Sequence, residues 1–148
     1  MHRFPEFFIN HWDLFLTLGV IVGLIVWQMF RGKLSGFNEL SPTETVQLIN
    51  HQNALVLDVR EDNEFRDGHI VDARHIPLGA LSKRLGELEA FKDKPVVVSC
   101  RSGHRSASAC GVLKKAGFTN IYNLHGGIMA WQNAGLPVNK GNPKRSKK

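Results

Sequence analysis

The fold is decided by the stretch Pro95-Val-Val-Val-Ser-Cys-Arg-Ser-Gly-His-Arg-Ser106. Residues 95–99 form the strongest candidate strand in the chain, a run of β-branched apolar residues that is typical of a buried strand. A helix is predicted over 105–116, and Gly117 is its stop signal. The chain therefore passes from a buried strand to a helix within about six residues. A strand–turn–helix unit of this kind belongs to a sheet of parallel strands.

The same alternation continues on both sides of this stretch. Ser41 and Glu44 form a predicted capping box for a helix, with Pro42 at its first position. We expect further strands at 54–57, 73–76 and 120–123 and further helices over 61–66, 78–88 and 128–133. Short apolar strands separated by helices predict an α/β fold, with a parallel sheet flanked by helices on both faces. In such sheets ligands bind at the carboxyl ends of the strands.

Residues 14–30 form an uncharged apolar run of 17 residues. As a helix the run spans roughly 25 Å, close to the thickness of a bilayer's hydrocarbon core. We interpret it as one N-terminal transmembrane helix, while a cleaved signal peptide and a buried soluble helix remain as alternatives. Lys/Arg residues are more frequent after the run, which favours an N-terminus outside and the following domain in the cytoplasm of a bacterial inner membrane. The expected divisions are 1–13, the helix 14–30, a linker 31–40, the folded domain 41–138 and a basic tail 139–148.

Charge is unevenly distributed along the 148 residues. The net charge is +1 for residues 1–36, zero for 37–139 and +5 for 140–148. An electrically balanced domain makes nucleic-acid binding unlikely. For the basic tail we expect a solvated end, with attraction to anionic lipid or to RNA as the alternative.

The turn after the strongest strand carries the candidate chemistry. Its backbone N–H groups can converge on one point, and the following helix directs its positive end to the same point. Arg101, His104 and Arg105 add cationic groups, and Gly103 permits an unusual turn. In such surroundings we expect Cys100 to ionise more readily than a free thiol, which makes it a candidate nucleophile.

The second cysteine and the histidines carry no comparable signal. Cys110 lies in the middle of a predicted helix, and we expect it to be a core residue. We expect turn or core positions for His69, His75 and His125, and core positions for Phe118 and Trp131. No Cys/His spacing predicts a metal site.

Several motifs in order along residues 37–138 resemble those of the rhodanese family. They are Asp58-Val-Arg-Glu61, Glu64-Phe-Arg-Asp-Gly-His-Ile70, Ala73-Arg-His-Ile-Pro77, the loop Cys100 to Arg105, Gly126-Gly127, Trp131 and Gly135-Leu-Pro-Val138. One departure is Asp72, where the family usually has a glycine turn. The resemblance implies a five-stranded parallel core, no metal or organic cofactor, and a persulfide on Cys100.

What the resemblance implies about function is a membrane-anchored sulfurtransferase. Thiosulfate or a small-molecule or protein persulfide is the expected donor, and a thiol is the expected acceptor. The loop residues Arg101, Ser102, Gly103, His104 and Arg105 would bind the persulfide, and Asp58 and Arg60 would support the loop. One alternative is a membrane-tethered interaction module with a membrane-protein partner. A minor alternative is phosphatase or arsenate reductase chemistry, which the resemblance disfavours because those relatives have one more residue between Cys and Arg.

Overall fold

The computed structural model describes residues 11–33 and 36–141. The chain divides into two compact units, residues 1–36 and 37–148, and each is described by itself. Most of the expected N-terminal segment 1–13 and of the basic tail 139–148 lies outside the described residues.

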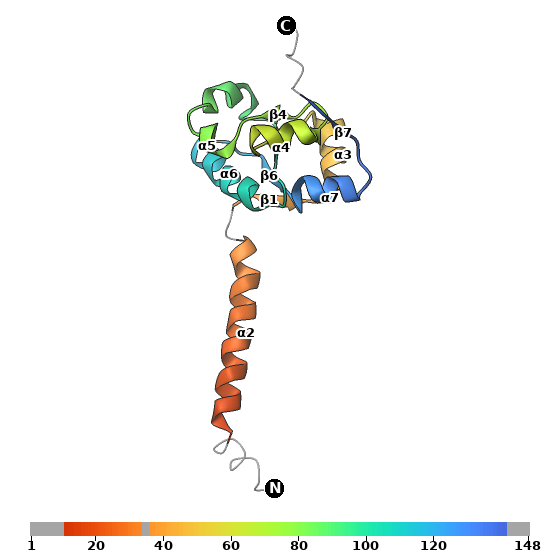
Figure 1. The fold of residues 1–148 in the computed structure, drawn as a ribbon. Helices are drawn as coiled ribbons and strands as arrows, with labels where there is room; N and C mark the ends of the chain where they lie inside the picture. Colours follow the sequence, from red (N-terminus) through yellow and green to blue (C-terminus); the bar gives the residue numbers. More distant parts are fainter. Residues whose placement is uncertain (1–10, 34–35, 142–148) are drawn as a thin grey trace. The chain divides into compact units, whose positions relative to one another are not determined.

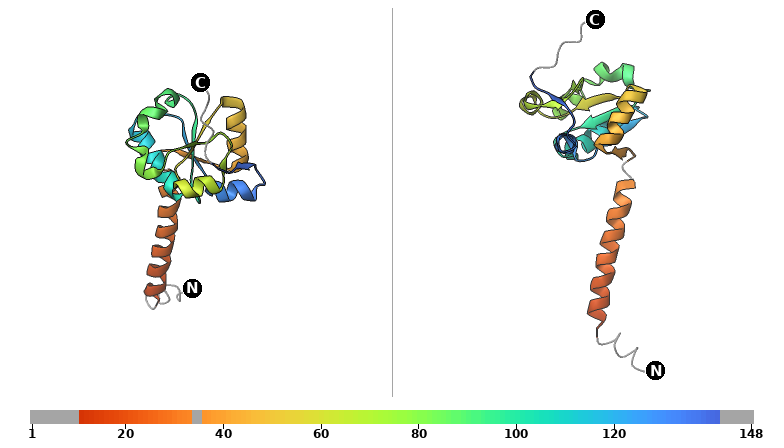
Figure 2. Two further views of the ribbon diagram at one scale, coloured as in Figure 1. Left: turned by 45° about the horizontal axis from the view of Figure 1, so that its top comes forward. Right: turned by 90° about the vertical axis from the view of Figure 1, so that its right-hand side faces the viewer.

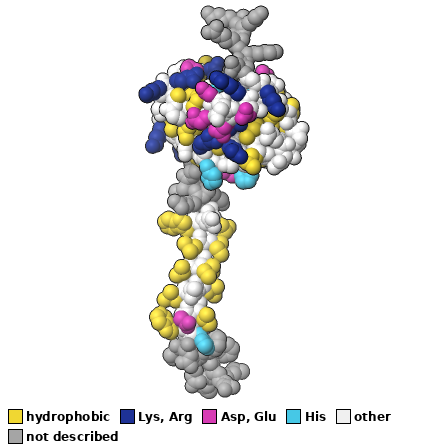
Figure 3. All heavy atoms as spheres, viewed as in Figure 1, with side chains coloured by type: hydrophobic (Ala, Val, Ile, Leu, Met, Phe, Trp, Pro, Cys, Tyr) yellow, Lys and Arg dark blue, Asp and Glu magenta, His cyan; other side chains and the backbone are white. Residues whose placement is uncertain are grey.

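In the described part of the first unit the chain forms one helix, α2 (Trp12–Lys33). It extends beyond both ends of the expected span 14–30. Residues 12–29 have a mean hydropathy of 1.7, and their side chains are exposed. Figure 3 shows apolar side chains along the helix. By length and composition α2 could cross a membrane, and a signal sequence would meet the same criteria.

The second unit is built on a five-stranded sheet whose strands are all parallel (Figure 1). Their order in the sheet is β1 (Asn38–Leu40), β6 (Ile121–Leu124), β5 (Val96–Ser99), β2 (Leu55–Asp58) and β4 (Arg74–His75). The strands β5 and β2 are central, and both are almost completely buried. Strands buried on both faces need no apolar–polar alternation, and this explains the continuous apolar runs in the sequence.

Helices cover both faces of the sheet, as the sequence predicts (Figure 2). Val96 and Val98 point into one core, which α5 (Leu78–Leu81), the 3-10 helix η1 (Leu85–Phe91) and α6 (His104–Lys115) cover. Val97 points into the other core, which α3 (Pro42–Gln52), α4 (Asp62–Asp67) and α7 (Gly127–Asn133) cover. Cys110 and Phe118 are buried in the first core and Trp131 in the second, which confirms the three predictions.

Three local features differ from expectation. The expected linker 31–40 contains the strand β1, whose three residues pair with β6 but are too few and too polar to show a strand pattern. The expected helix 78–88 is instead α5 followed by η1. Its leucines include two pairs three residues apart, a spacing that a 3-10 turn also satisfies. A small antiparallel sheet, which the sequence does not predict, joins β3 (His69–Ile70) to β7 (Val138–Asn139), whereas the expected strand 73–76 is present as the two residues of β4.

The predicted start of α3 is confirmed in atomic detail. The backbone N–H of Glu44 donates to Ser41 Oγ over 3.3 Å, and the backbone N–H of Ser41 donates to Glu44 Oε2 over 2.8 Å. This capping box orients the helix that leads into β2 and thus toward the end of the sheet where Asp58 lies.

Candidate active site

The loop between β5 and α6 forms a turn around the sulfur of Cys100. Cys100 follows β5 directly and is 1% exposed. The backbone N–H of Gly103 donates a hydrogen bond to Cys100 Sγ over 3.1 Å. Gly103 has a φ of 106°, a left-handed conformation that favours glycine and lets the turn close within a few residues. Of the backbone N–H groups that we expect to converge on the sulfur, that of Gly103 lies within hydrogen-bond distance.

The start of α7 holds the outer side of this loop. The N–H of Ile128 donates to the carbonyl oxygen of Cys100 over 2.8 Å, and the N–H of Met129 donates to that of Arg101 over 3.3 Å. At Gly127 a Cβ atom would lie 2.4 Å from the carbonyl oxygen of Cys100, so only glycine allows α7 this close. Because the loop carbonyls point outward to α7, the opposite side of the loop can direct N–H groups toward the sulfur.

Two buried polar side chains continue the hydrogen bonds of the sulfur into the sheet. Ser106 Oγ lies 3.3 Å from Cys100 Sγ and 2.6 Å from Asn123 Oδ1, so its one hydroxyl proton can go to Asn123 when Cys100 is a thiol and to the sulfur when Cys100 is a thiolate. Asn123 lies in β6, and its Nδ2 donates to the carbonyl oxygen of Gly103 over 3.2 Å. The Asn123 amide therefore links β6 to the loop at Gly103 and to the first turn of α6 at Ser106.

The two cysteines have opposite electrostatic surroundings. Burial raises the pKa of Cys100, but hydrogen bonds from Ser106 and from the backbone N–H groups of residues 102, 103 and 106 outweigh it and leave the pKa below its ordinary value. Burial raises the pKa of Cys110 to about 12, since the core supplies little compensation for a thiolate there. Of the two thiols, Cys100 is thus the one that ionises more readily to the nucleophilic thiolate.

The arginine at the end of the loop is held by a carboxylate from α4. Arg105 Nη1 and Nη2 donate to Glu64 Oε2 and Oε1 over 2.6 and 2.8 Å. The guanidinium hydrogen bonds lower the pKa of Glu64 to about 2, and the same contact raises the pKa of Arg105. Arg101, Ser102 and His104, which the sequence also marks as loop residues, are exposed.

Asp58 and Arg60 form a buried ion pair near the base of the site. They are 1% and 4% exposed, and Arg60 Nη2 lies 2.6 Å from Asp58 Oδ2. Arg60 also donates to the carbonyl oxygens of Glu64 and Gly68, over 3.1 and 2.7 Å. The pair thus fastens α4 at Glu64 and at the residue just past its C-terminus, Gly68, and α4 in turn presents Glu64 to Arg105. A buried carboxylate without a partner would be costly, and Arg60 supplies that partner for Asp58.

Sequence reasoning missed three residues of the site: Glu64, Ser106 and Asn123. Glu64 and Ser106 stand within the quoted motifs without an assigned role. Asn123 is a buried polar residue at the carboxyl end of β6, beside Val98 in the register of the sheet. A polar residue at the end of a strand next to the strand that carries the nucleophile is a signal that could have indicated it.

The described residues contain no cluster of His, Cys, Asp or Glu that could hold a metal ion. His69 is buried, His75 is half-buried and stacks on Phe65, and His125 lies in the turn before α7. These are turn or core positions, as predicted.

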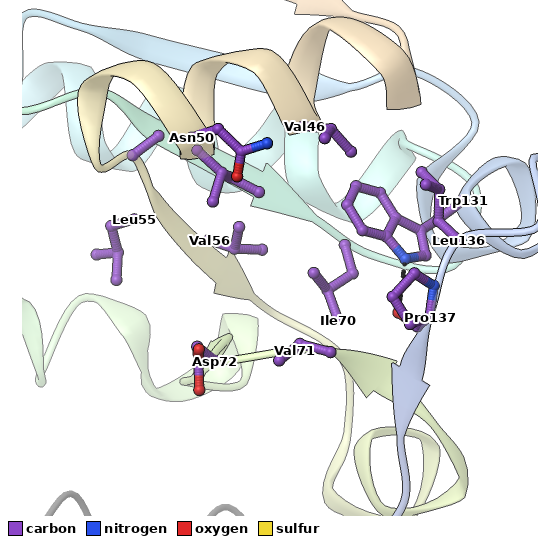
Figure 4. A pocket seen from close by; sticks show the side chains of 12 residues that line it. Val46, Asn50, Leu55, Val56, Ile70, Val71, Asp72, Trp131, Leu136 and Pro137 are labelled. Atoms are coloured by element: carbon purple, nitrogen blue, oxygen red, sulfur yellow. Dashed lines mark hydrogen bonds between the residues drawn. The ribbon is translucent and has the colours of Figure 1, made fainter.

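A mostly apolar pocket of about 290 Å³ lies apart from the Cys100 loop, and Figure 4 shows its lining. Its walls come from α3, β2, β3, α7 and the segment that follows α7, and they include Val46, Ile70 and Trp131. Residues 100–106 take no part in lining it, so the pocket does not serve the cysteine.

The fold and the site together define a class of protein: a parallel α/β domain with a candidate nucleophilic cysteine at the carboxyl end of its central strand. The Rhodanese-like domain matches residues 41–134, and the chain belongs to the rhodanese family. It is 33% identical to YibN of Escherichia coli K12 over 125 residues, which are 84% of this chain and 87% of that protein. It is 35% identical to the thiosulfate sulfurtransferase GlpE of Shewanella oneidensis over 101 residues, 68% of this chain and 98% of that one. The crystal structure of a rhodanese-related protein from Thermoplasma volcanium superposes with a TM-score of 0.63 at 34% identity, covering 70% of this chain and 98% of its own. The resemblance seen in the sequence is thereby confirmed.

Proposed function

We propose that this protein is a membrane-anchored single-domain sulfurtransferase that carries sulfane sulfur as a persulfide on Cys100. The observation that carries the proposal is the hydrogen-bonded environment of Cys100 Sγ, where the N–H of Gly103 and the hydroxyl of Ser106 lie 3.1 and 3.3 Å away. Membership of the rhodanese family and the sulfurtransferase names of relatives support the reaction class.

The transfer has two halves. The Cys100 thiolate attacks the outer sulfur of thiosulfate or of a persulfide. A new bond forms between the two sulfurs, and the donor's own S–S bond breaks with its electron pair leaving on sulfite or on a thiolate. The backbone N–H groups around the loop then hold the charge on the outer sulfur of the Cys100 persulfide. A thiol acceptor attacks that outer sulfur in the second half and releases the Cys100 thiolate.

The remaining loop residues have supporting roles in this proposal. Arg101, Ser102 and His104 are exposed around the mouth of the site, where they can contact a donor or an acceptor. Arg105 and Gly103 shape the loop, while Asp58 and Arg60 act through α4. The helix α2 would anchor the domain at the inner membrane, with the domain in the cytoplasm, where a reducing environment keeps both thiols free.

The test is thiosulfate:cyanide sulfurtransferase turnover by the full chain in detergent micelles. Activity lost in Cys100→Ser and kept in Cys110→Ser would support the proposal, since Cys110 is a buried thiol outside the loop. Mass spectrometry of the donor-treated protein should show one added sulfur on Cys100.

Two results would contradict it. A folded wild-type chain that accepts sulfur neither from thiosulfate nor from alkyl persulfides would favour a tethered interaction module. Hydrolysis of p-nitrophenyl phosphate that disappears in Cys100→Ser would favour the phosphatase alternative. The four residues between Cys100 and Arg105 leave a small turn, and this argues against the bulkier phosphate.

A further inference from the structure

The positive charge at the end of the loop, Arg105, already has a counterion. Both terminal nitrogens of Arg105 donate to both oxygens of Glu64, in a bidentate pair of 2.6 and 2.8 Å. The two side chains are 35% and 24% exposed, so the pair is partly shielded from water. Bidentate arginine–carboxylate pairs are strong and geometrically specific. An anion entering the site therefore has to compete with Glu64 for this guanidinium.

Arg60, the cation near the base of the site, is also paired with a carboxylate. Arg60 is paired with the buried carboxylate of Asp58. The remaining cationic side chains of the loop, Arg101 and His104, are exposed, where water and salt weaken their attraction. Figure 3 shows Asp and Glu side chains intermixed with Lys and Arg on the face that carries α4. The two buried or half-buried cations of the site are thus offset by two carboxylates.

The offset of the site's cations by carboxylates affects thiosulfate and alkyl persulfides differently. Thiosulfate carries two negative charges, and its attack by the Cys100 thiolate brings three negative charges together. An alkyl persulfide carries at most one. The repulsion between a fixed carboxylate and a donor scales with the charge of the donor. Glu64 therefore repels thiosulfate about twice as strongly as it repels a singly charged persulfide.

We propose that Glu64 is a specificity-determining residue that makes the site favour alkyl or protein persulfides over thiosulfate as sulfur donors. The proposal rests on the sulfurtransferase function proposed above and names the donor class for it. Glu64 touches neither donor in this reading. It acts by cancelling the charge of Arg105 at the edge of the loop.

Both donor reactions balance without a further reactant. With a protonated persulfide RSSH, the thiolate takes the outer sulfur together with its proton, and the inner sulfur leaves as RS⁻. With thiosulfate, the thiolate takes the outer sulfur and sulfite leaves with the electron pair. The net charge is conserved in each case, at −1 and at −3. Only the second reaction gathers the larger charge in the loop.

The test compares the second-order rate of Cys100 persulfide formation for thiosulfate and for the persulfide of 2-mercaptoethanol, using the full chain in detergent. Glu64→Gln should raise the rate with thiosulfate about tenfold and with the organic persulfide at most about threefold. Asp67→Asn is the matched control, because it removes an exposed carboxylate from the same helix without a contact to Arg105. The ratio of the two rates should be unchanged in Asp67→Asn and in Glu64→Asp, which keeps the charge.

A double-mutant cycle separates charge balance from loop geometry. Arg105→Gln leaves Glu64 without its cation and should lower the thiosulfate-to-persulfide ratio. The double variant Glu64→Gln/Arg105→Gln restores the wild-type net charge and should return the ratio toward the wild-type value. If Glu64→Gln does not fold because Arg105 is left without its counterion, the double variant leaves neither charge unpaired, and the fall in Arg105→Gln with the recovery in the double variant decides the question.

Each outcome has one meaning. A rate that falls by the same factor for both donors in Glu64→Gln would show that Glu64 only positions Arg105, and the proposal would be wrong. An unchanged ratio would overturn it equally, while leaving the sulfurtransferase function intact. A wild-type chain that accepts sulfur from neither donor would overturn the proposed function, and the donor preference with it.

Discussion

Replacing Gly127 with alanine tests whether α7 shapes the Cys100 loop. The new Cβ would lie 2.4 Å from the carbonyl oxygen of Cys100 and 2.6 Å from the carbonyl carbon of Arg101, while ordinary contacts begin near 3.4 Å. The helix and the loop must therefore separate by about 1 Å. Because both are backbone, no side chain can rotate away to relieve the overlap.

The cost has two parts. Gly127 has a φ of +57°, and a left-handed alanine costs about 1–2 kcal/mol. The overlap adds about 1–3 kcal/mol, as overpacking in cores does. Since stabilities of about 5–15 kcal/mol are usual, we expect Gly127→Ala to fold but to melt clearly lower. The loop displacement should also lower sulfurtransferase activity more than tenfold, since misplacement of about 1 Å can cost 10²-fold.

The matched control is Gly135→Ala. Gly135 also has a positive φ, +71°, but an added Cβ would meet no atom within 4 Å. Gly135→Ala should lower the free energy of unfolding only by the cost of a left-handed alanine, about 1–2 kcal/mol, and should keep its activity. The assay is thermal unfolding of the detergent-solubilised chain followed by circular dichroism, with turnover measured on the same samples. Equal melting temperatures and equal activities in the two variants would refute the contact between α7 and the loop.

Three further predictions concern the polar groups around the site. Ser106→Ala removes a hydrogen bond to Cys100 Sγ and should raise the pKa of that thiol, seen as a shift of the alkylation–pH profile to higher pH. Arg60→Met leaves the buried Asp58 without its cation and should cost about 3–5 kcal/mol of unfolding free energy, measured by denaturant titration. Glu64 has a pKa of about 2, below its ordinary 4.5, so its contribution to stability is complete above pH 4.5 and is lost as the pH falls toward 2. The difference in melting temperature between wild type and Glu64→Gln should therefore shrink over that range.

Control variants and the pH dependence test these three predictions. The alkylation profile of Ser106→Ala must differ from that of Ser108→Ala, whose hydroxyl is exposed on the same helix. Arg66→Met, at an exposed position of α4, should cost less than about 0.5 kcal/mol, and an equal loss in both arginine variants would exclude the buried pair as the cause. A melting-temperature difference independent of pH would show that the Glu64 carboxylate does not stabilise the domain through its charge.

The sequence predicts the sheet and its nucleophile because both depend on local patterns. The apolar run 95–99 can only be a buried strand in this context, and the loop after it places Cys100 at the carboxyl end of that strand. The parallel arrangement follows from the alternation with helices. The strand β1 escapes prediction because its stability comes from pairing with β6 across more than 80 residues.

The supporting half of the site is missed for the same physical reason. Glu64 meets Arg105 over 41 residues, and Asn123 meets Ser106 over 17. Neither contact has a periodicity or a spacing that the chain repeats. The pair of Asp58 and Arg60 is easier to predict from the sequence, because charged residues at the end of a buried strand need a partner of opposite charge. Their contact with α4 instead of the Cys100 loop appears only in three dimensions.

The dependence of the loop on α7 has a consequence for the newly made protein. The carbonyl oxygens of Cys100 and Arg101 accept hydrogen bonds from the N–H groups of residues 128 and 129, and these residues are synthesised after the loop. Asn123, which fastens Gly103, is also made later. During N-to-C synthesis Cys100 thus emerges as an ordinary thiol, with neither its turn nor its hydrogen bonds complete. Cys100 acquires its final surroundings only when α7 packs against the loop. A chain interrupted before α7 would therefore carry the cysteine without the hydrogen bonds that shape its loop.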